Sequence, residues 1–229
     1  MTRVPITRLA ASALALLALP AGAGAAQVTV DRACYPGTDT APVKVSATGF
    51  TPGETYTLLL NGGVTKSGTV DAGGAVNVEI DAPPPPDSGK SAYDADFKLE
   101  IRQGALSAST GFRSALVFSD FNPGSGDPLK LRVRFSAFGF GIATAPGAQQ
   151  PEIFVHYVSP KGKLKKTVSL GRGQGACGSI RRSAKLHLFP FRPANGRWTL
   201  QFDTKRGYTK GKATSRFPWD SLTLDVSAR

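Results

Sequence analysis

The chain has 229 residues, and its 28 Lys and Arg against 16 Asp and Glu give a formal net charge of +12. A chain of this length forms one large domain or two of about 100 residues. Its two cysteines and two histidines lack zinc-site spacing, no acidic loop has the EF-hand pattern, and no paired carboxylates stand in a glycosidase context. We therefore expect no cofactor, no metal and no enzymatic activity.

The first 26 residues have the three parts of a secretory signal peptide. Arg3 and Arg8 precede an apolar run at residues 9–19, and Ala23 and Ala25 follow in an A-x-A arrangement. The run is shorter than the ~20 residues that span a bilayer, and no later segment comes close. We expect residues 1–26 to be removed and the product to be secreted, free outside the cell or held at the wall, with no transmembrane segment in its mature form.

Apolar and polar residues alternate through the rest of the chain, as they do in half-buried strands. The clearest cases are Val43/Val45/Ala47, Val76/Val78/Ile80, Phe97/Leu99/Ile101, Leu131/Val133/Phe135 and Trp198/Leu200/Phe202. Turn residues separate the strand patterns, as at Asn61-Gly62 and Asn195-Gly196, where Asn-Gly supplies the positive φ angles of tight hairpins. The pattern predicts an all-β fold of antiparallel sandwiches or barrels.

The chain divides best at residues 121–128 (FNPGSGDP), which are dense in residues that stop strands. An internal echo supports the division, because SATGF at residues 46–50 recurs as SAFGF at residues 136–140, an offset of 90 residues. We predict one domain at residues 27–120, a linker at 121–128 and a second domain at 129–229. The prolines at residues 83–86 are interpreted as a stiff loop between strands of the first domain.

Residues 40–82 resemble the bacterial immunoglobulin-like domains of exported proteins, through GFTPG at residues 49–53 and the hairpin DAGG at residues 71–74. The resemblance implies two tandem immunoglobulin-like antiparallel β-sandwich domains. It implies little about function, since such domains serve as spacers, adhesin modules and carbohydrate-binding accessories. The second half, with FPFRPANGRWTLQFDT, resembles exported bacterial sandwich domains of no known activity.

The charge divides at the predicted linker. Residues 27–127 carry 7 Lys and Arg against 12 Asp and Glu, a net of −5, whereas residues 128–229 carry 19 against 4, a net of +15. We predict a polyanion-binding surface on the second domain. Its candidate residues are Lys161, Lys163, Lys165, Lys166, Arg172, Arg181, Arg182 and Lys185, and a further basic cluster follows at Lys205, Arg206, Lys210 and Lys212.

Anionic polysaccharide and wall polymers are the favoured partners of this surface outside the cell, ahead of lipid headgroups and nucleic acid. Tyr208 and Trp219 stand beside turn residues and are candidates for stacking on a ligand, although Leu222 and Leu224 favour a core position for Trp219. Two alternatives stay open for the charge. The cations protect strand edges from aggregation, or the acidic domain docks against the basic one. The sequence does not indicate the oligomeric state.

A Gly-rich stretch at residues 171–182 (GRGQGACGSIRR) contains a formal G-x-G-x-x-G. A dinucleotide site needs a helix after the glycines, to direct its N-terminus at the pyrophosphate. The residues after Gly178 show alternation at Leu186 and Leu188 and no helical face. The stretch therefore does not indicate a nucleotide site.

A second hypothesis for this stretch is thiol chemistry at Cys177, in an Arg-rich setting that lowers a thiol pKa, with His156 or His187 and Asp203 completing a Cys-His-Asp set. The L,D-transpeptidases offer the nearest comparison, but Gly175 and Ala176 stand where their signature has His-Gly. The favoured interpretation is a disulfide between Cys34 and Cys177, because two cysteines in an exported chain form one bridge. We thus expect a non-catalytic exported binding or structural module, with a wall-directed thiol transferase or hydrolase as the alternative.

Overall fold

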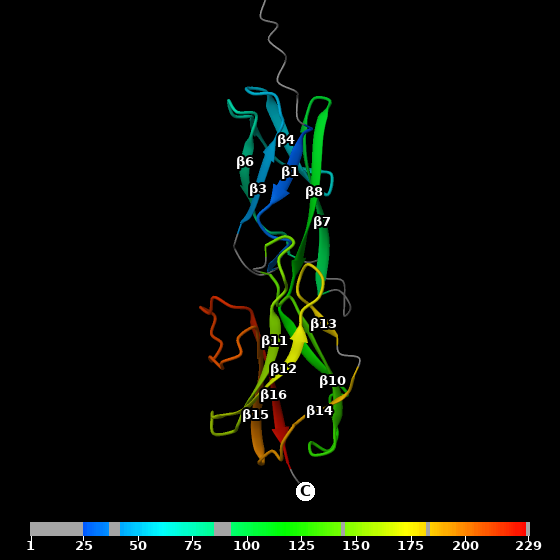
Figure 1. Ribbon diagram of the computed structural model, residues 1–229, viewed down its shortest axis with the longest axis vertical. Coiled ribbons are helices and arrows are strands. Elements are labelled where there is room, and N and C mark those ends of the chain that lie inside the picture. Colours follow the sequence, from blue (N-terminus) through cyan, green and yellow to red (C-terminus); the bar gives the residue numbers. More distant parts are fainter. Residues whose placement is uncertain (1–24, 37–41, 85–92, 143–144, 182–183, 228–229) are drawn as a thin grey trace, which may run out of the picture.

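The computed structural model describes residues 25–36, 42–84, 93–142, 145–181 and 184–227, and within these ranges it has sixteen β-strands and no helix. The predicted all-β fold is confirmed. The strands form two groups that lie end to end along the long axis of an extended molecule (Figure 1). No helix that could cross a membrane occurs in the described ranges. Apart from Ala25 and Ala26, the predicted signal peptide lies outside the described residues.

The first half of the molecule packs two sheets face to face. One sheet has the order β1 (Gln27–Val30), β3 (Val43–Thr48) and β6 (Val76–Ile80). The other has the order β2 (Cys34–Pro36), β8 (Leu106–Ala115), β7 (Asp94–Gln103), β4 (Thr55–Leu60) and β5 (Gly63–Thr69), with β2 parallel to β8. Alternate residues face inward as predicted, since Val43, Val45 and Ala47 are buried while Lys44 and Ser46 are exposed.

The second half repeats this layered arrangement with a core of its own. One sheet centres on β10 (Arg132–Phe138), which pairs with β9 (Phe118–Asn122), β13 (Ile180–Arg181) and β14 (Leu186–His187). The facing sheet has the order β12 (Leu164–Arg172), β11 (Glu152–Val158), β15 (Gly196–Asp203) and β16 (Trp219–Val226). Val133, Phe135, Trp198, Leu200 and Phe202 belong to the core between them, which matches the alternation in the sequence.

Of the two asparagine-glycine turns expected to close hairpins, Asn61-Gly62 does so, whereas Asn195-Gly196 connects β14, which pairs with β10, to β15, which pairs with β11 and β16 in the other sheet. Asn61 has φ 48° and Gly62 has φ 84°, which is the positive-φ pair that a two-residue turn between β4 and β5 requires. In the second half, Gly196 has φ 119° and lies directly against Pro160. The second turn thereby positions the segment before β15 beside the β11–β12 hairpin.

The chain passes between the two cores at Leu116 and Val117, a shorter connection than the predicted linker. The linker was expected at residues 121–128, but Phe121 and Asn122 lie in β9, where Phe121 pairs with Phe135 of β10. Residues 123–131 form the loop from β9 to β10, within the second half. Phe121 is buried in the second core, so the strand extends through it. The strand ends only at the Pro and Gly residues that follow.

The joint between the halves is apolar. Tyr93 stacks on Phe118 and Phe138 with ring centroids 4.5 Å and 4.6 Å apart, and Cys34 and Cys177 pack with Ala115 and Ile142. Within the described part of the chain, no ion pair joins the halves. Acids of the first half are paired within it instead, as where Arg113 binds Asp94 and Asp96. The hydrogen bond from Arg113 lowers the pKa of Asp96.

Candidate anion-binding surface

The β11–β12 hairpin carries four of the predicted anion-binding lysines. A tight turn closes it, in which Gly162 N–H donates to Ser159 O (2.8 Å) and Ser159 N–H donates to Lys163 O (2.9 Å). Strand β12 is an edge strand, so its cations stand in solvent. Lys161, Lys163, Lys165 and Lys166 are all exposed, and none forms an ion pair with a described residue.

Of the other predicted cations that the structure describes, Arg172 ends β12, Arg181 lies in β13 and Lys185 directly precedes β14. Arg172 donates to Gln150 O (3.0 Å), and Arg181 covers the ring of Phe138 at 5.1 Å. Lys185 is exposed, and Arg182 lies outside the described residues. One antiparallel bridge between Gln174 and Ser179 closes the Gly-rich turn, after which β13 pairs with β10, so the cations of β12 and β13 lie on different sheets.

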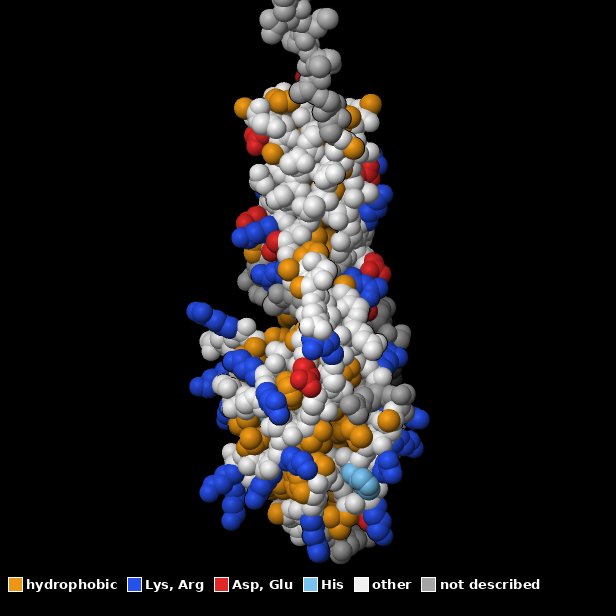
Figure 2. Space-filling view, viewed as in Figure 1, with side chains coloured by type: hydrophobic (Ala, Val, Ile, Leu, Met, Phe, Trp, Pro, Cys, Tyr) orange, Lys and Arg blue, Asp and Glu red, His pale blue; other side chains and the backbone are white. Residues whose placement is uncertain are grey.

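Acidic side chains compensate little of this charge. Residues 128–229 contain four of them. Asp203 is fully buried, Asp220 accepts hydrogen bonds from Ser119, Asp225 pairs with Arg197, and Glu152 accepts a hydrogen bond from Ser169. On the face shown in Figure 2, Lys and Arg cover the lower half with few acids between them, whereas the upper half mixes both signs.

A groove of about 490 Å³ lies between the β11–β12 hairpin and residues 191–198, and we call it the basic groove. Its lining includes four cationic side chains and no acidic one. The lining residues are Ser159, Pro160, Lys161, Lys165, Lys166, Phe191, Arg192, Ala194, Asn195 and Trp198. Sequence reasoning missed Arg192, which is far from the hairpin lysines in the chain and reaches them only because the Asn195-Gly196 turn folds back against Pro160.

The floor of the basic groove is fixed by packing. Trp198 is almost fully buried and its Nε1–H donates to Ala194 O (2.8 Å). The half-buried Phe191 packs on Trp198 and Tyr157, with ring centroids 5.4 Å and 5.5 Å apart. The groove therefore combines an apolar floor with a cationic rim.

A second basic element is the loop of residues 204–218, which joins β15 to β16 and projects from the side of the second half (orange to red in Figure 1). It carries Lys205, Arg206, Lys210, Lys212 and Arg216 and no acidic residue. Lys205 Nζ lies 4.1 Å from the ring centroid of Phe217. Trp219 Nε1–H donates to Lys212 O (3.0 Å), so this half-buried tryptophan supports the loop.

A buried polar cluster holds this loop on the sheet. His156 Nε2 lies 3.1 Å from both Asp203 Oδ1 and Lys205 O, and its Nδ1 lies 2.8 Å from Thr167 Oγ1. Lys205 N–H donates to Asp203 Oδ1, while Gln201 donates to Asp203 and to Thr209 O. Burial, and then the nearby charge of Asp203, raise the pKa of Tyr208, which packs beside His156.

The thiol hypothesis is contradicted at its nucleophile. Cys177 is bonded to Cys34, so it has no free thiol, and the predicted disulfide is confirmed. His156 is fully buried and its ring nitrogens contact Thr167, Asp203 and Lys205, which makes it a structural histidine.

The Gly-rich stretch is a tight turn that carries this disulfide. Gly171, Gly175 and Gly178 have φ of 101°, 69° and 61°, and strand β13 follows where a dinucleotide site would need a helix. At Gly178 the backbone passes so close to Gly141 that a Cβ would lie 2.5 Å from Gly141 N. Among the described residues, no group of three or more His, Cys, Asp or Glu is arranged to hold a metal ion.

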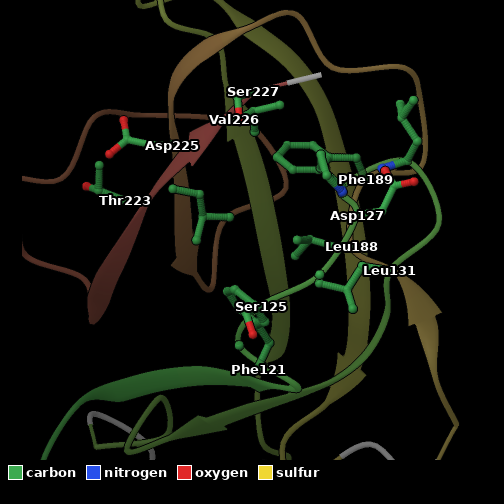
Figure 3. A pocket seen from close by; sticks show the side chains of 15 residues that line it. Phe121, Ser125, Asp127, Leu131, Leu188, Phe189, Thr223, Asp225, Val226 and Ser227 are labelled. Carbon is green, nitrogen blue, oxygen red and sulfur yellow. The ribbon is translucent and has the colours of Figure 1, made fainter. Parts of the chain in front are cut away.

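A further hollow of about 670 Å³ lies at the far end of the second half, between the β9–β10 loop and β16. Figure 3 shows Phe121, Leu131, Leu188 and Phe189 around it, together with Asp127. Its lining contains Asp127 and Asp225 and no cation, so the hollow does not suit an anionic ligand.

No protein-family model and no curated protein matches the chain. Solved structures are similar at low identity. They include a tetra-tandem repeat in the extending region of a large adhesion protein (16% identity, TM-score 0.28, 90% of this chain and 50% of that one) and bovine butyrophilin (10%, TM-score 0.30, 89% and 99%). Fibronectin(III)-like modules of Clostridium thermocellum CbhA also match (10%, TM-score 0.27, 87% and 93%). The chain spans half the length of the adhesion-protein repeat.

Proposed function

We propose that the protein is an exported, non-catalytic binding or structural module that contacts an anionic polymer of the cell envelope or extracellular matrix through the basic surface of its second half. The observation that carries the proposal is the imbalance of charge. Residues 128–229 hold 19 Lys and Arg, while their four acids are buried, bonded to hydroxyl groups or paired with Arg197.

Two further features support this choice. A disulfide across the joint of the two halves favours an oxidising compartment, in agreement with the predicted signal peptide. Cations on several separate elements suit a repetitive polyanion better than one small molecule. These elements are the β11–β12 hairpin, the end of β12 with β13, and the loop at residues 204–218. Anionic polysaccharide and wall polymer remain the favoured partners.

Binding to immobilised polymers tests the proposal. The full mature chain is applied to dextran sulfate, polygalacturonate and neutral dextran at about 0.05 M salt and eluted with a rising salt gradient. We expect retention on both anionic polymers, elution by salt because ion pairing releases counterions, and no retention on neutral dextran.

A charge variant and a matched control make the test specific. Replacement of the eight candidate cations by Gln should abolish retention, whereas Lys44→Gln with Lys66→Gln, in the first half, should leave it unchanged. Absence of retention by the wild type would overturn the proposal and leave a scaffold role alone. If the eight-site variant is retained as strongly as the wild type, the contact with the polymer lies on another surface.

A further inference from the structure

We propose that the basic groove is a subsite for a single acidic sugar unit, a pyranose ring that carries a carboxylate or a sulfate, within the polymer that the second half binds. This inference rests on the proposed function and narrows it from a charged surface to one defined site. The apolar floor of the groove would contact the sugar ring, and the cationic rim would bind its carboxylate or sulfate.

The floor fits the apolar face of a sugar ring. Pro160 is exposed and Phe191 is half-buried, and both line the groove. A pyranose presents C–H groups on its faces, and these gain hydrophobic contact on apolar and aromatic surfaces. A volume of about 490 Å³ lies within the range of small-molecule sites, ~300–1,000 Å³.

The rim fits the anionic substituent. Lys161, Lys165, Lys166 and Arg192 line the groove, and none has an ion-pair partner among the described residues. The guanidinium of Arg192 provides parallel donors for a carboxylate or sulfate, and the lysines add point charges around it. Cations over a partly apolar site gain more from an anion than cations in open solvent do.

The groove is also prepared before binding. Tyr157, Phe189 and Trp198 support Phe191 from below, and the hydrogen bond from Trp198 to Ala194 fixes the segment that carries Arg192. A fixed floor lowers the entropy that the protein loses on binding. The groove contains one partly exposed aromatic ring, whereas single-stranded nucleic acid binds along successive stacking platforms, so the architecture favours a sugar over a base.

Two variants with equal loss of charge separate the groove from general electrostatics. The groove variant is Lys161→Gln, Lys165→Gln, Lys166→Gln and Arg192→Gln. The matched control removes four exposed cations outside the groove, Lys163→Gln, Lys185→Gln, Lys210→Gln and Lys212→Gln. Each is titrated with tetragalacturonate, with a sulfated dextran oligosaccharide, and with inorganic polyphosphate, which is anionic but has no ring.

We expect the groove variant to lose about tenfold or more in affinity for the acidic oligosaccharides, and the control no more than about threefold. Both variants should lose affinity for polyphosphate equally, because only general electrostatics act there. The carboxylate and sulfate ligands show which anion the rim prefers.

A third variant tests the floor. Phe191→Leu keeps an apolar side chain but removes the ring, so we expect affinity for the acidic oligosaccharides to fall about threefold while the dependence on salt is unchanged, since apolar contact is not screened. The thermal midpoint of each variant is measured beside it.

The outcomes separate the inference from the proposed function. If both four-site variants lose equally on every ligand, the groove is not a subsite, although the charged surface still binds polyanions. If the wild type binds none of the three ligands, the proposed function itself fails. If Phe191→Leu keeps its fold and binds the acidic oligosaccharides with full affinity, the ring of Phe191 does not contact the sugar.

Discussion

Cys34 in β2 and Cys177 in the Gly-rich turn are joined by a disulfide across 143 residues, with Cα atoms 5.1 Å apart and both side chains buried at the joint of the two halves. The bond lies beside Ala115, the last residue before the chain crosses from the first core to the second. Two covalent connections, the backbone and the disulfide, therefore meet at one place and define how the halves sit relative to each other.

Removal of this disulfide should destabilise the joint. For Cys34→Ala with Cys177→Ala, the chain-entropy model gives a loss of up to about 5 kcal/mol for a loop of this length. Urea unfolding with and without reductant measures the loss, and reductant should have no effect on the double variant. Non-reducing peptide mapping should recover the crosslinked Cys34 and Cys177 peptides from the wild type. Alkylated Cys177 without a crosslink would contradict the structure.

Two glycines of the same turn should respond differently to alanine. Gly175 and Gly178 both have positive φ, so each substitution costs about 1 kcal/mol for backbone strain. A Cβ at Gly178 would also lie 2.5 Å from Gly141 N, whereas nothing lies within 4 Å of a Cβ at Gly175. We expect Gly178→Ala to lose about 3 kcal/mol or more and Gly175→Ala about 1, in urea unfolding. Equal losses would show that the backbones are not in close contact.

The buried cluster around Asp203 should control access to the loop at residues 204–218. Asp203→Ala removes the acceptor of Lys205 N–H, Gln201 and His156, and unsatisfied buried groups of this kind cost about 3 kcal/mol or more. The loop then opens and trypsin cleaves it faster after its lysines and arginines. Asp225→Ala, which breaks only the exposed pair with Arg197, is the control and should leave the cleavage rate unchanged. Identical digestion of both variants would mean that the cluster does not hold the loop.

Stability should fall in alkali partly because of Tyr157. Burial raises the pKa of its phenol, while in the unfolded chain the phenol ionises near pH 10. Below pH 10 the phenol is protonated in both states, so Tyr157 adds no pH dependence to stability. Above pH 10 the unfolded state loses the proton first, and the contribution of Tyr157 lowers the free energy of unfolding by about 1.4 kcal/mol per pH unit. Tyr157→Phe should fall less steeply between about pH 10 and 11.5. Parallel curves for the two proteins would show that Tyr157 ionises without unfolding.

The local pattern of the sequence predicted the strands. Alternation at Val43/Val45/Ala47 and at Trp198/Leu200/Phe202 identified the buried faces correctly, because a strand places successive side chains on opposite faces whatever it pairs with. The disulfide was also predictable, since two cysteines allow one connectivity. The excess of cations in the second half was countable from the residues alone.

The tertiary structure alone decided which of these residues meet. Arg192 joins Lys161, Lys165 and Lys166 in the basic groove because the turn at Gly196 folds against Pro160, a contact between segments more than 30 residues apart in the sequence. His156 and Asp203 form a buried anchor, although sequence spacing suited a catalytic set equally well. Phe121 belongs to β9 because it pairs with Phe135 of β10. The residues around Phe121 in the sequence do not indicate this pairing. Composition and hydrophobic periodicity are properties of short segments of the sequence. Which side chains contact one another depends on the packing of strands that are distant in the sequence, and the basic groove is formed by such contacts.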